Sequence, residues 1–358
     1  MQRLRDFLHV PAADNDHHPA LRIMLGVGIP LLILVAVDRM DLAVFATLGA
    51  FTGVYGRGEA HRVRFSQQWR AGVMMLVAIS AGMAVSHLQP ESGALVAATS
   101  LVGALGSAAA RLTRLKPTGS LFFVFGFSAA AFMNPPAPTL EGLGVAAATV
   151  VLALVLGVAG WVLPGHQTPW VRMRPPRLNA DERRDVYGAA LLHLVAVWVA
   201  GTAAERTGFT HSYWAMIAAT VPLHGAITGH GVSRGVQRIV GTSGGLLIAG
   251  VLFGLNLEGM QLAAVVLVLQ FLVEFYVTRH YALAQALVTP LALLMIEAAA
   301  PADPWALMLE RFVETVIGAS VGIAFVLLVQ LIRRKEEDRG ANGEQPEAGE
   351  GPHSPTNG

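Results

Sequence analysis

The chain has 358 residues, of which 54% are hydrophobic and only 14% are charged, and its formal net charge is +1. A typical soluble domain has about 25% charged residues. The composition therefore excludes a soluble enzyme, a nucleic-acid-binding protein and a disordered scaffold. The chain contains no cysteine, which excludes disulfides, thiolate catalysis and zinc–thiolate sites.

The first 20 residues do not have the composition of a signal peptide. They include three aspartates and two adjacent histidines, and no small-residue cleavage site follows a short apolar stretch. We expect residues 1–20 to form a cytoplasmic N-terminal segment. At the other end, residues 333–358 begin with three cations and continue in Gly, Pro, Glu and Ser, which predicts a disordered cytoplasmic tail.

Between these ends, apolar runs of the length that a bilayer-crossing helix needs recur along the whole chain. They predict an all-α polytopic membrane protein with about twelve transmembrane helices, and whether the short run 41–56 fully crosses is left open. The predicted spans are 21–37, 41–56, 69–87, 93–110, 118–133, 141–163, 185–203, 211–228, 236–255, 260–277, 281–299 and 305–332.

The distribution of cations predicts the orientation of these spans. Short loops rich in Arg and Lys stay in the cytoplasm. With twelve spans and a cytoplasmic N-terminus, 22 of the 25 cations fall on the cytoplasmic side, and only Arg39, Arg206 and Arg311 fall at or near the outer side. This indicates a bacterial inner-membrane protein with both termini in the cytoplasm.

The two halves of the chain resemble each other. With an offset of 166 residues, Leu121–Trp161 aligns with Leu287–Leu327 without a gap, and with an offset of 168 Arg70 aligns with Arg238. Six spans in each half give both halves the same orientation, which predicts two parallel six-helix repeats. The first repeat is expected at 21–163 and the second at 185–332, joined by a cytoplasmic linker at 164–184.

The second half carries the most specific motif. Tyr213-Trp214 opens one span, and the next span begins with Arg234, Arg238 and the sequence 241–245, which contains Gly241, Thr242 and Gly245. Tyr and Trp are typical of the outer membrane interface. The two arginines lie four residues apart and share one helix face, and the glycines favour close packing of helices in lipid.

These residues resemble the fusaric acid resistance-like (FUSC) membrane transporters, the aromatic acid exporter group to which the plant aluminium-activated malate channels are related. The family pattern of Tyr-Trp followed by Arg-x-x-x-Arg-x-x-Gly-Thr-x-x-Gly is matched here, and the resemblance covers residues 200–330. The resemblance implies export of organic anions, often aromatic carboxylates. A passive anion channel and a membrane accessory protein that does not transport remain alternatives.

Polar residues inside the spans are the candidate lining of a pathway, because a charge in the bilayer costs at least ~2.5–3.5 kcal/mol. Glu274 is expected to couple transport to protons or to pair with Arg279 or with the face of Arg234 and Arg238. Arg311 and Glu314 can pair at i, i+3, and either Glu310 or Glu314 could carry a proton. The lone His193 is expected to be a hydrogen-bonded packing residue. The complete set of candidate pathway residues is Arg70, Arg234, Arg238, Glu274, Gln285, Thr289, Arg311 and Glu314.

No pattern in the sequence indicates an enzyme. Gly229-His230-Gly231 does not form a phosphate-binding loop, and no set of His and acidic residues has metal-ligand spacing. We therefore expect neither a cofactor nor a metal. The expected partners are the lipid bilayer and a small organic anion, with no nucleic acid; a homo-oligomer is left open.

Overall fold

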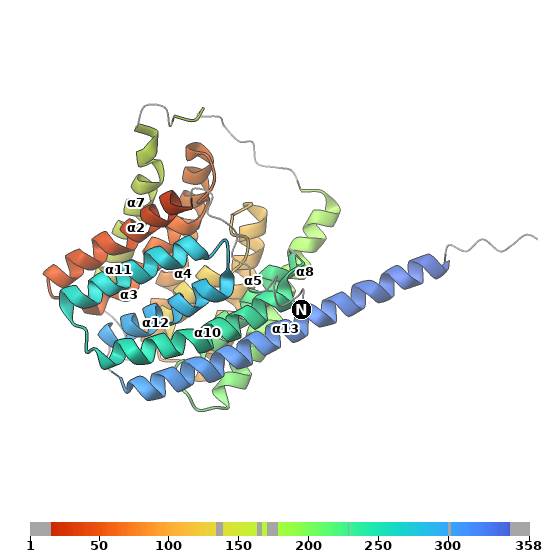
Figure 1. Cartoon of the computed structure of the whole chain (residues 1–358). Helices are drawn as coiled ribbons and strands as arrows, with labels where there is room; N and C mark the ends of the chain where they lie inside the picture. The colour runs from red at the N-terminus through yellow and green to blue at the C-terminus, as the bar shows by residue number, and fades with distance from the viewer. Residues whose placement is uncertain are drawn as a thin grey trace, which may run out of the picture.

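The computed structural model describes residues 16–133, 139–162, 167–169, 178–227, 229–299 and 302–343, and within these ranges the chain is helical without strands (Figure 1). Short 3₁₀ turns occur at Met40–Leu42, Phe51–Val54 and Gly160–Val162. The α-helices are α2 (His17–Ala36), α3 (Ala43–Ala50), α4 (His61–Leu88), α5 (Ser92–Leu112), α6 (Leu121–Ala131), α7 (Thr139–Ala159), α8 (Ala180–Glu205), α9 (Tyr213–Ile227), α10 (Gly231–Gly254), α11 (Gly259–Tyr276), α12 (Tyr281–Ala299) and α13 (Pro304–Gly343).

Each predicted span corresponds to one of these helices, but the helices differ in length. Within the described ranges, nine helices are long and apolar enough to cross a membrane. Helices α3, α6 and α9 have 8, 11 and 15 residues. At 1.5 Å per residue, an 11-residue helix covers about half of a ~30 Å hydrocarbon core. The structure thus shows an all-helical polytopic protein with nine full-length candidate spans in the described ranges, and a membrane crossing by α3, α6 and α9 stays a prediction.

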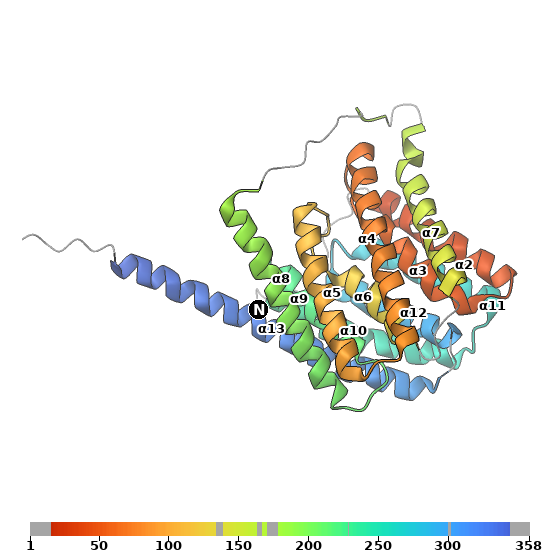
Figure 2. The same cartoon turned by 180° about the vertical axis from the view of Figure 1, so that it is seen from behind.

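The helices pack in pairs that recur in the two halves of the chain. Helix α4 packs against α6 and α7, and α10 packs in the same way against α12 and α13; likewise α3 packs on α7, and α9 on α13. Contacts also cross between the halves, since α2 packs on α11 and α5 packs on α8. The two halves are thus interlocked side by side (Figure 2).

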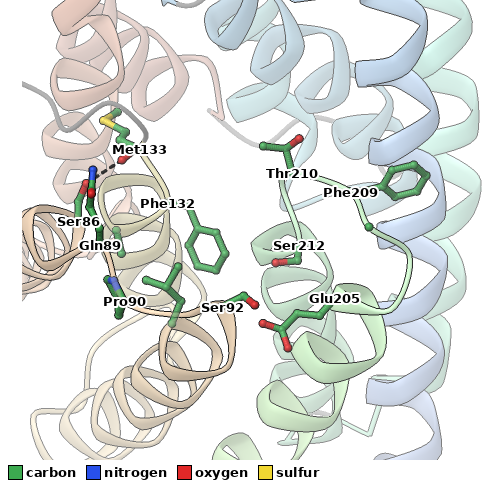
Figure 3. Close-up of a pocket in the computed structure, with 13 residues that line it drawn as sticks. Ser86, Gln89, Pro90, Ser92, Phe132, Met133, Glu205, Phe209, Thr210 and Ser212 are labelled. Carbon is green, nitrogen blue, oxygen red and sulfur yellow. Dashed lines mark hydrogen bonds between the residues drawn. The ribbon is translucent and has the colours of Figure 1, made fainter.

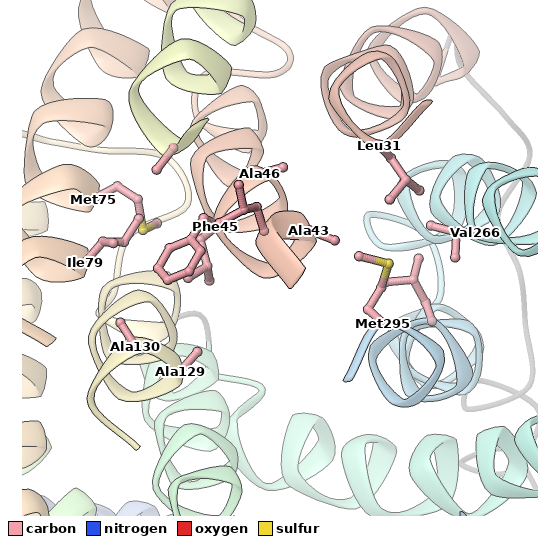
Figure 4. Packing of buried hydrophobic residues seen from close by; sticks show 14 of the residues in the cluster. Leu31, Ala43, Phe45, Ala46, Met75, Ile79, Ala129, Ala130, Val266 and Met295 are labelled. Carbon is pink, nitrogen blue, oxygen red and sulfur yellow. The ribbon is translucent and has the colours of Figure 1, made fainter. Parts of the chain in front are cut away.

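The main core lies around α3, where both halves meet. Phe45 on α3 packs with Met75 of α4 and the alanines of α6, while Ala43 faces Leu31 of α2 and Met295 of α12 (Figure 4). The short helices α3 and α6 are buried over most of their length. Neighbouring helices cover most of both, which suits helices that are too short to span a bilayer alone.

The outer surface of the longer helices is apolar. Leu21 and Ile33 on α2, Val77 on α4, Leu247 on α10 and Leu328 on α13 are among many large apolar side chains that are more than a third exposed. A soluble monomer rarely exposes a continuous apolar surface of this kind. A lipid environment accounts for it.

Helix α13 is longer than the sequence predicted. It runs to Gly343 and extends well beyond the bundle (Figure 1), whereas disorder was expected from residue 333. Its last turns contain Lys335, Glu336 and Arg339, which are good helix formers and need no burial. The remainder of the predicted tail, most of the N-terminal segment and most of the linker lie outside the described residues.

Candidate functional site

The clearest polar network inside the helical bundle surrounds Arg238 on α10. Its side chain is 4% exposed and donates hydrogen bonds to the hydroxyl of Tyr281 at 3.1 Å and to Oε1 of Gln285 at 3.3 Å. Nε2 of Gln285 donates in turn to the hydroxyls of Thr242 at 3.2 Å and Thr289 at 3.4 Å. The hydrogen-bond partners of Arg238 in the described part of the chain are therefore neutral, and its Nε has none.

Glycines on α10 make this network possible. A Cβ atom on Gly241 would lie 2.5 Å from the carbonyl oxygen of Ala282, and one on Gly245 would lie 2.6 Å from that of Ala286. No side chain fits at these distances, so α10 and α12 approach with their backbones almost in contact. This approach brings Arg238 within reach of Gln285 on α12.

A second buried cation, Arg311 on α13, lies nearby. Its guanidinium carbon lies 4.6 Å from the ring centroid of Trp214, and Arg311 and Trp214 are 4% and 0% exposed. Arg311 lies within electrostatic range of Arg238, which repels it, and of Glu314, which attracts it. Among the residues that the structure describes, no carboxylate comes within 4 Å of either guanidinium.

Glu314, one turn after Glu310 on α13, is completely buried, and neither of its carboxylate oxygens has a hydrogen-bond partner within the described ranges. It lies near the backbone amides of Trp214 and Ala215 at the start of α9. Helix α13 comes this close because residue 318 is glycine: a Cβ there would lie 2.0 Å from the carbonyl oxygen of Ala215.

The two glutamates of α13 have different surroundings, although the sequence did not distinguish them. Glu310 pairs with Nδ1 of His211 at 2.5 Å and accepts a longer hydrogen bond from the backbone of Thr210. Glu314 is left without such a partner. Arg311 and Glu314 do not form the expected direct ion pair within 4 Å: the guanidinium stacks on Trp214, and the carboxylate of Glu314 lies within electrostatic range of it.

Two other predicted residues, Arg234 and Arg70, lie in different surroundings. Arg234 stacks over the ring of Tyr281, with 4.9 Å to the centroid, at the edge of the Arg238 network. Arg70 is exposed and donates to the carbonyl of Thr113, so it does not occupy a place equivalent to that of the buried Arg238. Arg70 and Arg238 therefore do not have the equivalent surroundings that the repeat predicted, because Arg70 is exposed and Arg238 is buried.

Glu274 does not pair with Arg279, Arg234 or Arg238. It pairs with Arg57, with 3.1 Å between Nη1 and Oε2, and also accepts a hydrogen bond from Gln270 at 3.3 Å. Arg57 lies just before α4, in the half of the chain opposite to Glu274. The expected partners were wrong because α11 packs on α2 and faces the first half.

Tyr213 and Trp214 were expected at the outer membrane interface, yet they are 6% and 0% exposed. The ring of Trp214 stacks on that of His211 at 5.0 Å between centroids, and Tyr213 contacts Phe132 of the first half. Sequence alone does not separate an interfacial aromatic pair from a buried one. Here the pair is part of the core beside Arg311.

A cavity of about 540 Å³ opens next to the His211–Glu310 pair, between the α4–α5 link, the end of α6 and the α8–α9 link (Figure 3). Glu205, Ser212 and Phe132 face the open space in this view. No basic residue occurs among the described residues that line it. The lining consists of Ser86, Gln89, Pro90, Ser92, Leu95, Ala131, Phe132, Met133, Glu205, Gly208, Phe209, Thr210 and Ser212.

Sequence reasoning did not single out Tyr281 as a partner of Arg238 or His211 as a partner of Glu310. Tyr281 lies four residues before Gln285, so the helical spacing was an available signal for its position on the same face. The pairing of His211 with Glu310 joins residues 99 positions apart and had no such signal.

Comparison with known proteins agrees with the predicted resemblance. Residues 194–325 match the family model described as fusaric acid resistance protein-like, and this range contains Arg238, Gln285, Arg311 and Glu314. The "uncharacterized membrane protein YvaC" of Bacillus subtilis (strain 168) is 28% identical over 150 residues, which are 42% of this chain and 24% of that protein. The aligned part thus spans about a quarter of that relative. No solved structure matches the chain.

The fold and these comparisons together identify a multi-pass membrane protein whose second half carries a fusaric acid resistance-like region.

Proposed function

We propose that this protein transports organic anions, with aromatic carboxylates as the preferred class, outward across the bacterial inner membrane. The observation that carries the proposal is the pair of buried guanidiniums, Arg238 and Arg311, that have no carboxylate within ion-pair distance in the described structure. Buried charges are normally paired. A transported anion supplies the missing negative charge.

Each residue of the network has a role in this proposal. Arg238 binds the carboxylate, since its planar guanidinium suits two parallel hydrogen bonds. Gln285, held by Thr242 and Thr289, keeps the guanidinium in place. The ring faces of Trp214 and Tyr281 beside the two arginines suit an aromatic substrate.

The proposed path runs from the cytoplasmic start of α10, past Arg238 and Arg311, to the cavity beside Glu205. The orientation follows from the cation distribution, with both termini in the cytoplasm. A basic cytoplasmic end concentrates anions, and an outer cavity without basic residues releases them. We further propose that the recurring helix pairs derive from two parallel six-helix repeats, 21–163 and 185–332, joined through 164–184.

The test is efflux of benzoate and of a set of aliphatic carboxylates from proteoliposomes that contain the purified protein. We expect benzoate efflux well above that of empty liposomes, and loss of most of it in Arg238→Gln. A matched control is Arg70→Gln, which removes an exposed arginine of the first half. Benzoate flux no faster than in empty liposomes would show an accessory protein instead.

A passive anion channel of the same architecture is the second candidate. The hydrogen-bond partners of Arg238, Tyr281 and Gln285, are neutral and do not form a binding site for a coupling ion. Accumulation of benzoate beyond the level that empty liposomes reach under the same pH gradient separates the two, because neutral benzoic acid crosses lipid by itself. A channel equilibrates the substrate and does not concentrate it.

A further inference from the structure

A second group of polar side chains, separate from the Arg238 network, has buried atoms without hydrogen-bond partners where α5 and the start of α6 meet α8 and α9. His193 itself is hydrogen-bonded as expected, through Nδ1 to the carbonyl of Ala189 at 2.8 Å, and only its Nε2 is left over. Ser107, Ser120 and His193 are 0%, 1% and 2% exposed, and His224 is half-buried. The atoms without a hydrogen-bond partner in the described structure are Oγ of Ser107, Oγ of Ser120, Nε2 of His193 and Nδ1 of His224. Buried polar groups are rarely left unsatisfied, so such a group needs an explanation.

Close contacts at two glycines bring together the segments that carry these side chains. A Cβ on Gly119 would lie 3.1 Å from Nδ1 of His224, which places the turn before Ser120 against this imidazole. Gly103 of α5 faces Val197 of α8, with 3.4 Å from a Cβ on the glycine to the valine side chain. Helices α5 and α8 are antiparallel. Ser107 lies one turn after Gly103 and His193 one turn before Val197, so both lie at the same level, closer to the cytoplasmic ends of the two helices.

The charges around the group are mostly positive. His193 lies within electrostatic range of Arg111 and His224, and His224 lies within range of Arg111 and Arg234. Asp185 acts on Arg111 from α8, and no ion pair of either arginine occurs among the described residues. The surroundings therefore favour a negatively charged occupant.

The corresponding position in the other half of the chain is occupied by a carboxylate side chain. The packing of α5 on α8 corresponds to that of α11 on α2, and at a spacing of 167 residues Ser107 corresponds to Glu274 and His224 to Arg57. Between α11 and α2, the carboxylate of Glu274 binds Arg57. Between α5 and α8, Ser107 stands at the position of Glu274, so no carboxylate is present there.

We infer that the group formed by Ser107, Ser120, His193 and His224 binds the carboxylate of a small organic anion, in the position that the Glu274 side chain occupies in the other half. The serine hydroxyls and the imidazole of His224 donate hydrogen bonds to the carboxylate, His193 lines the site, and Arg111 and Arg234 supply the charge partners. The site lies near the cytoplasmic end of α10, ahead of Arg238. In the proposed transport function, this group is the entry site for the anion. The inference depends on that function only for the choice of an aromatic carboxylate as the ligand.

The experiment measures benzoate binding by calorimetry to purified protein that carries Arg238→Gln, so that the proposed transport site does not contribute. We expect binding to persist in this background. His224→Gln should weaken it roughly tenfold or more, as for a lost charge-assisted hydrogen bond. Ser107→Glu should abolish it, because the introduced carboxylate occupies the site.

Two controls keep the outcome clear. Ser100→Ala removes another buried serine hydroxyl of α5, one that bonds only to its own helix at Val96, and should leave binding unchanged. The melting temperature of Ser107→Glu should rise, since a carboxylate there neutralises the basic group; a water-filled site would instead make the buried glutamate destabilising. Unchanged benzoate binding in both His224→Gln and Ser107→Glu, or no binding in the Arg238→Gln background, would overturn the inference. Neither result bears on the proposed role of Arg238, which the efflux experiment tests separately.

Discussion

Glu274 on α11 and Arg57 before α4 form a buried ion pair between residues 217 positions apart, with 3.1 Å between Oε2 and Nη1. Arg57 also donates to the backbone carbonyl of Glu274 at 2.7 Å, and Arg22 donates to the carbonyl of Arg57 at 3.0 Å. The contact joins the two halves of the chain. It indicates that Glu274 stabilises their packing and is not part of the Arg238 network.

We therefore expect Glu274→Gln to lower stability, because the guanidinium of Arg57, whose side chain is only 14% exposed, would lose its counter-charge. Removal of one partner of a buried ion pair costs about 3–5 kcal/mol. The melting temperature in detergent should fall clearly, while benzoate efflux per folded molecule stays near wild type. The exposed Glu258→Gln is the matched control. The exchange Arg57→Glu with Glu274→Arg should recover part of the stability, and a loss of transport at unchanged stability would contradict this role.

Substitutions at Arg238 should separate charge from geometry. Arg238→Ala removes the proposed carboxylate ligand and should reduce benzoate efflux by at least an order of magnitude, as expected for a charged hydrogen bond of ~1.5–3 kcal/mol. Arg238→Lys keeps the charge but cannot bind a carboxylate through two nitrogens, so it should restore only part of the rate. Efflux at the wild-type rate in Arg238→Ala would exclude this residue from the pathway.

Glu314 is the better candidate of the two glutamates for carrying a proton, since it is buried and has no hydrogen-bond partner in the described structure, whereas Glu310 is held by His211. Glu314→Gln should fold normally and lose the stimulation of efflux by a pH gradient, while exchange of benzoate without a gradient continues. Glu310→Gln should instead lower the melting temperature. If Glu314→Gln kept the full response to the gradient, coupling through this residue would be ruled out.

Three glycines of α10 provide a matched test of helix packing. Gly241→Ala and Gly245→Ala place a methyl group 2.5–2.6 Å from a carbonyl oxygen of α12, and such overpacking costs about 1–3 kcal/mol. Both variants should melt earlier and transport poorly, because α12 and Gln285 move away from Arg238. In Gly244→Ala the new atom would lie 3.8 Å from the side chain of Ala286, so this variant should be neutral or slightly stabilised. Equal behaviour of all three would contradict the packing argument.

The orientation can be tested with single cysteines, because the chain contains none. Cysteines at the exposed positions 258 and 303 should react with a membrane-impermeant maleimide from the periplasm, and those at Ala60 and Ala180 only after the membrane is opened. Pro136 and Pro176, which lie outside the described residues, offer a further outer and inner pair. Reaction of Asp303→Cys and Ala180→Cys from the same side would contradict the predicted orientation.

The existence of the helices followed from apolar runs bounded by Pro, Gly and charges, and the motif around Arg238 brought several true neighbours together in the sequence analysis. The partners of Glu274 and Glu310 could not be predicted, because they depend on which helices pack across the two halves. The buried position of Trp214 was equally hidden, since a Tyr-Trp pair suits an interface and a core alike. Ser107 and His224 belong to no recognisable sequence motif, so a role for them can be inferred only from the residues that surround them in the fold.

The short helix α6 also has a consequence for biogenesis. Its 11 residues are too few to partition into a bilayer as an independent segment. The nascent chain cannot release α6 into lipid alone, so α6 must enter together with α4, against which it packs, and the same applies to the still shorter α3. We expect insertion of the first half to proceed in groups of helices, with truncations after residue 131 left incompletely inserted.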